Sequence, residues 1–223
     1  MSPGQINALG IIGAGQMGAG IAQVAAQSGI DVVLVDAQRD WAEKGKKKID
    51  GALDKLVQKG KLKPAFQKDG TVTAGNSSTI NDGAAAIIVC GADVAEKRGW
   101  KPLAKIRAMA QAAQAPEWFT TAPAVSIDRA LAKAKLSRGE IDLYEINEAF
   151  AVVAIANNQL LELDPKKVNV HGGAVALGHP IGASGARILT TLIHALKHEG
   201  KKRGVAAICI GGGEATAMLV EAV

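Results

Sequence analysis

Three polar side chains that follow apolar runs of the sequence can do acid/base chemistry: Asn147, His179 and Cys209. A thiol beside an imidazole suits nucleophilic or proton-transfer work, because a nearby imidazolium lowers the pKa of a thiol. The glycine run that begins at Gly211 offers backbone N–H groups for a developing oxyanion. If the three loops meet at one edge of a sheet, these groups form one site. The alternatives are an inert buried cysteine and an asparagine that caps a helix.

His179 lies in a glycine-rich segment, residues 172–187, which holds five glycines in sixteen positions. Each glycine gives up more backbone freedom on folding than any other residue, so this segment indicates a close approach of the backbone to a ligand. A helix that begins near Ser184 would direct its free N–H groups at the same place. A glycine-rich turn with a hydrogen-bonded histidine is the alternative.

A second candidate site is the motif formed by Gly13, Gly15 and Gly18, which lies between a predicted strand and a predicted helix. Asp36 follows the next predicted strand, and this order is typical of dinucleotide binding. Gly13 makes the turn, Gly15 admits a pyrophosphate, and Gly18 allows close helix packing. Asp36 would accept a hydrogen bond from a ribose hydroxyl and repel a 2′-phosphate, which favours NAD over NADP.

The elements that position these residues follow from apolar periodicity. Strands and helices alternate, so the chain is expected to be an α/β protein: a truncated Rossmann βαβα unit, then an α/β domain with a mixed sheet covered by helices. Residues 105–114 are compatible with a helix or a strand. Helices are predicted over residues 19–28, 40–61, 92–98, 123–135, 151–161 and 184–197, and strands over residues 8–12, 32–35, 84–89, 141–146, 205–210 and 215–223.

The strand–helix alternation of the first part ends at Pro64. This proline stops a helix, and no third Rossmann strand follows. Residues 1–62 are therefore expected to form a partial Rossmann dinucleotide-binding unit. Residues 63–223 are expected to form the second domain. A complete NAD domain needs more strands and a second half for the nicotinamide, so the first unit is too short to be one.

Composition narrows the class of partner. Hydrophobic residues make up 48% of the 223 residues and aromatics only 3%, so small aliphatic side chains fill the interior. The net charge of +5 comes from scattered lysines with few aromatics, which favours an anionic small molecule over nucleic acid. No apolar run is long enough to span a membrane, and the start does not resemble a signal peptide. We therefore expect a cytoplasmic protein without nucleic-acid or membrane partners.

The two cysteines, Cys90 and Cys209, form no CxxC pair, and both lie in apolar, strand-like runs. A structural disulfide and a zinc site are therefore not expected, and no metal is predicted.

The run GAGQMGAGIA at residues 13–22, followed by Val35 and Asp36, resembles the start of the 3-hydroxyacyl-CoA dehydrogenases over residues 8–62. In that family a later histidine and glutamate perform the hydride-transfer chemistry, and a helical second domain completes the acyl-CoA site. Neither has a counterpart in this sequence. The resemblance implies an NAD-binding fragment, with residual dehydrogenase activity as an alternative function.

Residues 64–223 resemble the C-terminal half of the thiolases, the acetyl-CoA C-acyltransferases. The resemblance is carried by NEAF at residues 147–150, GHPIGASG at residues 178–185 and CIGGG at residues 209–213, together with residues 70–86, which are similar to the segment that lines the coenzyme A tunnel. It implies a thiolase-like fold for this domain and a coenzyme A thioester as substrate.

The resemblance also implies roles for single residues. Asn147, through a held water, and His179 would bind a thioester oxygen. Cys209 would be the acid/base that removes an α-proton from an acyl-CoA, and Gly211 would serve a second oxyanion site. Ser78 would contact the pantetheine arm.

The sequence also departs from the thiolase pattern. Thiolases carry a nucleophilic cysteine in a Cys-x-Ser-Gly setting in their first half, and this sequence has no such motif; Cys90 lies after a predicted strand and does not replace it. The chain reads as a fusion of parts of two enzymes that act consecutively in fatty-acid and butanoate metabolism. Acyl transfer would be complete only if a partner chain supplies the nucleophile. The alternatives are α-proton exchange alone and a catalytically inactive CoA- or NAD-binding fusion product.

Half a thiolase would expose a large apolar surface to water. Two copies that pair across this surface would cover it, and twofold pairing is the commonest solution. We therefore expect a homodimer or a larger homo-oligomer.

Overall fold

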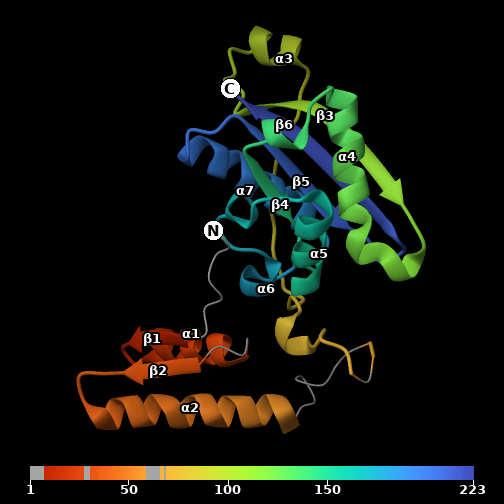
Figure 1. Ribbon diagram of the computed structural model, residues 1–223. Coiled ribbons are helices and arrows are strands. Elements are labelled where there is room, and N and C mark those ends of the chain that lie inside the picture. The colour runs from red at the N-terminus through yellow and green to blue at the C-terminus, as the bar shows by residue number, and fades with distance from the viewer. Residues whose placement is uncertain (1–7, 28–30, 59–65, 68) are drawn as a thin grey trace. The chain divides into compact units, whose positions relative to one another are not determined.

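The computed structural model describes residues 8–27, 31–58, 66–67 and 69–223. The chain divides into two compact units, Met1–Gly75 and Asn76–Val223 (Figure 1). The predicted boundary between residues 62 and 63 lies outside the described residues, so it stays a prediction.

The first unit has the predicted order of a strand, a helix, a strand and a helix. Its two strands pair in parallel, with Ala8 opposite Asp31. Side chains alternate along the second strand, so Leu34 is partly buried while Val33 and Val35 are exposed on the other face. The elements are β1 (Ala8–Ile12), α1 (Gln16–Gln27), β2 (Asp31–Val35) and α2 (Arg39–Gln58).

The second unit is built on a four-stranded sheet in the order β3-β6-β5-β4. β4 runs parallel to β5, while β6 is antiparallel to both β5 and β3, so the sheet is mixed as predicted. Residues 105–114, whose sequence is compatible with a helix or a strand, belong almost entirely to strand β3. The strands are β3 (Ala104–Ala113), β4 (Leu143–Ile146), β5 (Arg203–Cys209) and β6 (Glu214–Ala222).

Helices cover both faces of this sheet, which gives three layers (Figure 1). α4 and α5 pack on one face and α7 packs on the other, each over its own apolar cluster. The α/β expectation is therefore confirmed. The helices of the unit are α3 (Ala92–Lys97), α4 (Ala122–Ala134), α5 (Ala151–Leu161), α6 (Ala174–Leu177) and α7 (Ser184–His198).

The buried face of α7 follows from its sequence. Ile188, Leu192 and Leu196 recur every four residues, so they fall on one side of the helix, and each is at most 2% exposed. Burying a side chain of this size stabilises the fold by about 1.5–3 kcal/mol. The apolar face fixes α7 against β4 and β5, and with it the start of the helix at Ser184.

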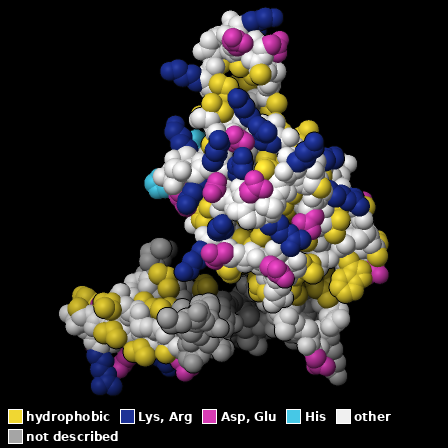
Figure 2. Space-filling view, turned by 45° about the horizontal axis from the view of Figure 1, so that its top comes forward, with side chains coloured by type: hydrophobic (Ala, Val, Ile, Leu, Met, Phe, Trp, Pro, Cys, Tyr) yellow, Lys and Arg dark blue, Asp and Glu magenta, His cyan; other side chains and the backbone are white. Residues whose placement is uncertain are grey.

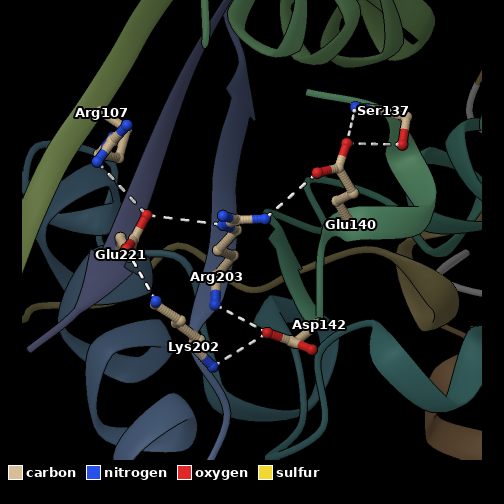
Figure 3. A network of polar contacts seen from close by, with 7 residues as sticks. All are labelled: Arg107, Ser137, Glu140, Asp142, Lys202, Arg203 and Glu221. Carbon is tan, nitrogen blue, oxygen red and sulfur yellow. Dashed lines mark hydrogen bonds and ion pairs between the residues drawn. The ribbon is translucent and has the colours of Figure 1, made fainter. Parts of the chain in front are cut away.

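Polar contacts join the strands at the edge of the sheet where β4 and β5 begin (Figure 3). The Asp142 carboxylate accepts hydrogen bonds from the backbone N–H groups of Lys202 and Arg203, at 3.0 and 2.8 Å. Arg203 also forms ion pairs with Glu221 and Glu140, at 3.6 and 3.4 Å. These contacts fix the register of β4, β5 and β6 at the edge opposite the candidate site.

One strand prediction is wrong. Residues 84–89 are not a strand, and among the described residues no strand pairs with them. Ile88 is 84% exposed and Val89 is 67% exposed. An apolar, β-branched run forms a strand only where a neighbour satisfies its backbone groups, and propensity alone does not supply one.

Candidate active site

Asn147 and Cys209 lie at the same edge of the sheet. β4 and β5 are parallel neighbours with Ile146 opposite Ala207, and the Asn147 N–H donates to the Ala207 carbonyl at 2.9 Å. Asn147 thus follows the carboxyl end of β4, and Cys209 ends β5. Polar groups at the carboxyl ends of parallel strands are well placed to meet a ligand.

Asn147 does not cap a helix, because α5 begins after Phe150, which is in the cap position. The Asn147 side chain is instead buried, with 1% of the residue exposed, and its Nδ2 lies 3.3 Å from Nε2 of His179. The helix-cap alternative for Asn147 is therefore wrong.

His179 is held by a tight turn between α6 and α7. Gly178 has φ +98°, and a Cβ there would contact the Asn81 side chain, so only glycine fits this position. The backbone N–H of His179 donates to the Thr79 carbonyl at 2.9 Å. The glycine in front of His179 thus allows a segment far away in the sequence to fix the histidine backbone.

Ser184 orients the imidazole of His179. The Ser184 Oγ lies 2.6 Å from Nδ1 of His179 and donates its own proton to the Pro180 carbonyl at 3.0 Å. In this arrangement Nδ1–H donates to Ser184, and Nε2 is left to accept a hydrogen bond from Asn147 Nδ2. If the hydroxyl proton rotates onto Nδ1, the ring proton moves to Nε2, which then becomes a donor.

The protonation states of the site follow from its burial. Burial lowers the pKa of His179, and the nearby Arg187 guanidinium lowers it further. Burial raises the pKa of the Cys209 thiol. At neutral pH the imidazole is therefore neutral and the thiol is protonated. A neutral imidazole and a protonated thiol suit proton transfer and the donation of a hydrogen bond better than they suit a resident thiolate nucleophile. Cys209 itself packs against the apolar cluster beneath α4 and α5.

Gly211 lies in the turn that joins β5 to β6. The turn is closed by hydrogen bonds from Gly213 N–H to the Ile210 carbonyl and from Ile210 N–H to the Glu214 carbonyl, at 3.1 and 2.8 Å. In the described part of the chain the Gly211 N–H donates to no protein group, and the residue is exposed. This leaves the N–H without a protein acceptor within the described residues, and the predicted oxyanion role of Gly211 stays a prediction.

The hydrogen-bonding groups of Ser78 are used within the protein. Its hydroxyl and its N–H both donate to the Ala149 carbonyl, at 3.0 Å each. Single β-bridges also join Ser77 to Phe150 and Ile80 to His179. Residues 77–80 therefore hold together the loop after β4 and the histidine turn. The predicted contact of Ser78 with a pantetheine arm stays a prediction.

Sequence reasoning missed several residues that build the site. The Glu148 carboxylate accepts hydrogen bonds from Val175 N–H and from Asn169 Nδ2, at 3.1 Å each. Gly173 must lack a side chain, because a Cβ there would contact Glu148. Two features of the sequence could have indicated these roles. Glu148 is a charged residue directly after Asn147, and Ser184 lies at the start of the helix that follows His179.

The glycine motif of the first unit has the predicted turn. Gly13 has φ +100°, and a Cβ on Gly18 would contact the Gly13 carbonyl, so both glycines are required. The Asp36 carboxylate accepts hydrogen bonds from the N–H groups of Ala14 and Ala37, at 2.6 and 2.7 Å. Asp36 thus stabilises the turn in which Gly15 would meet a pyrophosphate.

The described residues of this unit form one half of a dinucleotide-binding fold. Its described sheet has two strands, so the described residues of this unit do not form the second half that holds a nicotinamide.

Other kinds of site are not apparent in the described residues. No group of three or more His, Cys, Asp or Glu side chains in that part of the chain can hold a metal ion. None of the helices within the described ranges is long and apolar enough to cross a membrane. Figure 2 shows basic side chains interspersed with acidic ones over the face in view. Two depressions, of about 580 and 710 Å³, lie beside α4 and α7 and are not lined by Asn147, His179 or Cys209.

The fold and the site together define an α/β protein in which an asparagine and a histidine meet at one edge of a mixed sheet, where a cysteine ends the neighbouring strand. Residues 100–222 match the family described as "Thiolase, C-terminal domain", and residues 8–121 match "3-hydroxyacyl-CoA dehydrogenase, NAD binding domain". The chain belongs to the thiolase family through its C-terminal part and to the family of that NAD binding domain through its N-terminal part.

Individual relatives agree with this assignment. The chain is 56% identical to acetyl-CoA acetyltransferase 1 of Arabidopsis thaliana and 55% identical to the mitochondrial acetyl-CoA acetyltransferase of Rattus norvegicus. Each match spans 162 residues, which is 72% of this chain and 39% or 38% of the relative. The chain thus spans about two fifths of the length of these curated relatives.

Solved structures show the same likeness. An acetyl-CoA acetyltransferase from Bacillus anthracis superposes with a TM-score of 0.71 at 46% identity, over 76% of this chain and 42% of that one. A human mitochondrial 3-ketoacyl-CoA thiolase in complex with CoA superposes with a TM-score of 0.68 at 44% identity, over 75% and 43%. The thiolase-like fold predicted from sequence is therefore confirmed.

Proposed function

We propose that the second unit binds an acyl-CoA thioester and exchanges its α-proton, which is the acid/base part of thiolase chemistry. The observation that carries this proposal is the contact between Asn147 Nδ2 and His179 Nε2 at 3.3 Å, at the sheet edge where Cys209 ends β5. The acetyl-CoA acetyltransferases and the CoA-bound thiolase among the relatives support a coenzyme A thioester as the ligand.

The exchange follows from the roles of these three residues. The thioester oxygen accepts hydrogen bonds from Asn147 Nδ2–H and from His179 Nε2–H, once the Ser184 hydroxyl proton has rotated onto Nδ1. The Cys209 thiolate removes a proton from the α-carbon, and the electron pair of that C–H bond moves to the oxygen as an enolate. The resulting Cys209 thiol exchanges its proton with solvent and returns one to the α-carbon. Gly211 N–H is a further donor at this edge.

Acyl transfer needs a nucleophile that this chain does not offer. The sequence has two cysteines and no Cys-x-Ser-Gly motif, and Cys90 is exposed, outside the pair formed by Asn147 and His179. We propose that condensation or thiolysis proceeds only when a partner chain brings a nucleophilic cysteine to His179.

The test is the entry of solvent deuterium into the methyl group of acetyl-CoA, followed by mass spectrometry. The chain is expected to incorporate deuterium above the buffer rate, and Cys209→Ala is expected to fall to that rate. Cys90→Ala is the matched control, because it removes an exposed thiol outside the site, and it should keep the full rate. Incorporation at the buffer rate by the unsubstituted chain, or full incorporation by Cys209→Ala, would contradict the proposal.

A second candidate is a coenzyme-binding protein without turnover. The ordered turn at Gly13 and the Asp36 carboxylate favour it, because they retain the start of a nucleotide site in the first unit. Calorimetric titration with coenzyme A and with NAD separates the candidates. Binding of either one without deuterium exchange favours this candidate, whereas exchange that depends on Cys209 excludes it.

A further inference from the structure

A buried pair of charged residues lies behind the histidine. Glu145 on β4 is 1% exposed, and its Oε2 lies 3.7 Å from Nη1 of Arg187 on α7, whose side chain is 19% exposed. Charged side chains are rarely buried to this degree in proteins. Neither residue is among those that bind the thioester in the proposed function.

The strand and the helix place this pair next to the site. Side chains alternate along β4, and Leu143 packs in the α7 cluster while Tyr144 packs in the opposite one. Glu145 therefore faces α7, and Asn147, two residues further, continues the same row. On α7, Arg187 lies one turn after Ser184, which contacts His179. The ion pair thus forms the layer directly beneath the pair of Asn147 and His179.

Several buried polar atoms of this layer form no hydrogen bond. Six buried side-chain atoms of the described residues have no hydrogen bond, and four of them are Glu145 Oε1, Asn147 Oδ1, Arg187 Nε and Arg187 Nη1. An unpaired buried group costs about 1–3 kcal/mol, so stability alone does not explain the cluster. A buried ion pair is also often no more stable than apolar residues in its place.

We propose that Glu145 and Arg187 are positioning residues for His179, and that the Arg187 charge keeps the imidazole neutral so that its ring nitrogens can exchange roles. A protonated imidazole would donate from both nitrogens, and the change between acceptor and donor at Nε2 would be lost. The role of this pair in catalysis rests on the proposed function, whereas its effect on His179 does not.

The charges around the pair agree with this assignment. Burial lowers the pKa of His179, and Arg187 lowers it further. Burial raises the pKa of Glu145 to about 7. The charge of Arg187 lowers this pKa, and the charge of Glu148 raises it. Below neutral pH Glu145 is therefore protonated, and Arg187 acts on His179 without a counter-charge. Above neutral pH the Glu145 carboxylate offsets Arg187.

The experiment is a pH titration of the histidine rings by two-bond ¹H–¹⁵N correlation NMR on the full chain without substrate. The His179 signal is assigned by its loss in His179→Asn. Arg187→Met is expected to raise the His179 pKa by about 1 pH unit, since the positive charge of Arg187 disfavours the protonated ring and a nearby charge shifts a pKa by roughly that much. Arg187→Lys keeps the charge and should keep the wild-type titration. The titration of Glu145 should give the wild-type His179 signal a second inflection near pH 7, and Glu145→Gln should lack it.

Lys197→Met is the matched control, because it removes an exposed cation from the same helix, ten residues away. That separation is about 15 Å along the helix, beyond the screening length of about 10 Å at 0.1 M salt, so the His179 pKa should not move. If Arg187→Met does not fold, the double variant Glu145→Leu with Arg187→Met is titrated in its place. An apolar pair there should be close to wild type in thermal stability and should still raise the His179 pKa.

An Arg187→Met variant, or the double variant, that is folded and has the wild-type His179 pKa would overturn the proposal. So would an equal rise in Arg187→Lys. Deuterium exchange separates this result from the proposed function: a His179 pKa that depends on Arg187 in a chain that does not exchange acetyl-CoA protons keeps the positioning pair and rejects the exchange activity.

Discussion

At the scale of single residues, the site depends on which proton each side chain holds. Ser184 connects His179 Nδ1 to the Pro180 carbonyl, so a rotation of one hydroxyl decides whether Nε2 accepts or donates. Asn147 is buried and faces the same Nε2 at 3.3 Å. The thioester oxygen in the proposed reaction competes with that contact. In that proposed reaction, the binding of the substrate would therefore change the histidine tautomer.

The rate of exchange should rise with pH. The raised pKa of the Cys209 thiol means that thiolate, the proposed base, is a small fraction at pH 7. Below the thiol pKa this fraction grows about tenfold per pH unit, and only the thiolate removes protons. Initial rates of deuterium incorporation at pH 7, 8 and 9 check this. A rate that is flat or falls over this range would show that Cys209 is not the base.

Sequence reasoning placed Asn147, His179 and Cys209 because each follows an apolar run, and such a pattern is local. It did not find Ser184 or Asn81 as partners of His179, because those contacts depend on how distant segments meet. The Asn81 side chain reaches the His179 N–H across 98 positions of the sequence, at 3.3 Å. Hydrogen bonds of this kind leave no periodicity to read.

At the scale of elements, the sheet was largely predictable because its strands bury continuous or alternating apolar runs. β5 and β6 fall within one or two residues of the predicted ranges. Residues 84–89 have the same apolar, β-branched character but form no strand, since a strand needs a neighbour that one-dimensional patterns do not name. Residues 105–114 were compatible with a helix or a strand, and their pairing with β6 makes them a strand.

Asp142 should stabilise the start of β4 and β5. Asp142→Ala removes the acceptor for two backbone N–H groups, those of Lys202 and Arg203, so the free energy of unfolding should fall by about 1–3 kcal/mol. Asp93→Ala is the matched control, because Asp93 is exposed and its ion pair with Lys97, at 4.0 Å, is long and solvated, so its effect should stay within about 0.5 kcal/mol. Urea unfolding measures both.

The pH dependence of this effect has a definite sign. Burial alone would raise the pKa of Asp142, but the N–H groups of Arg203 and Lys202 and nearby lysines hold it below its usual value. A carboxyl whose folded pKa is lowered stabilises the fold above the unfolded value of about 3.9 and loses that contribution as pH falls. The difference between wild type and Asp142→Ala should thus shrink below about pH 4. A difference that grows there would contradict this account.

At the scale of the whole molecule, apolar side chains next to the site residues face solvent. Ile181 is 63% exposed two residues after His179, Ile210 is 47% exposed one residue after Cys209, and Ile80, bridged to His179, is 81% exposed. Exposed apolar groups at a site indicate that another surface covers them. This agrees with a chain that spans about two fifths of its relatives.

We predict that the chain self-associates through this surface. Light scattering at micromolar concentration should give the mass of a dimer or a larger assembly. Ile181→Asp should shift the chain toward a monomer, because a charge in an apolar interface is costly. Ile155→Asp, on α5, is the matched control, since Ile155 is 55% exposed and outside the site, and it should not change the mass. A monodisperse monomer of the unsubstituted chain would contradict the prediction.

The most direct test of the central claim combines two measurements on one preparation with acetyl-CoA in heavy water. The claim is that this chain carries the acid/base part of a thiolase site without its nucleophile. We predict deuterium in the acetyl methyl group, lost in Cys209→Ala, together with no acetyl group on any cysteine of the chain in the intact-protein mass spectrum. An acetylated cysteine would show a nucleophile in this chain and contradict the claim, as would the lack of exchange above the buffer rate.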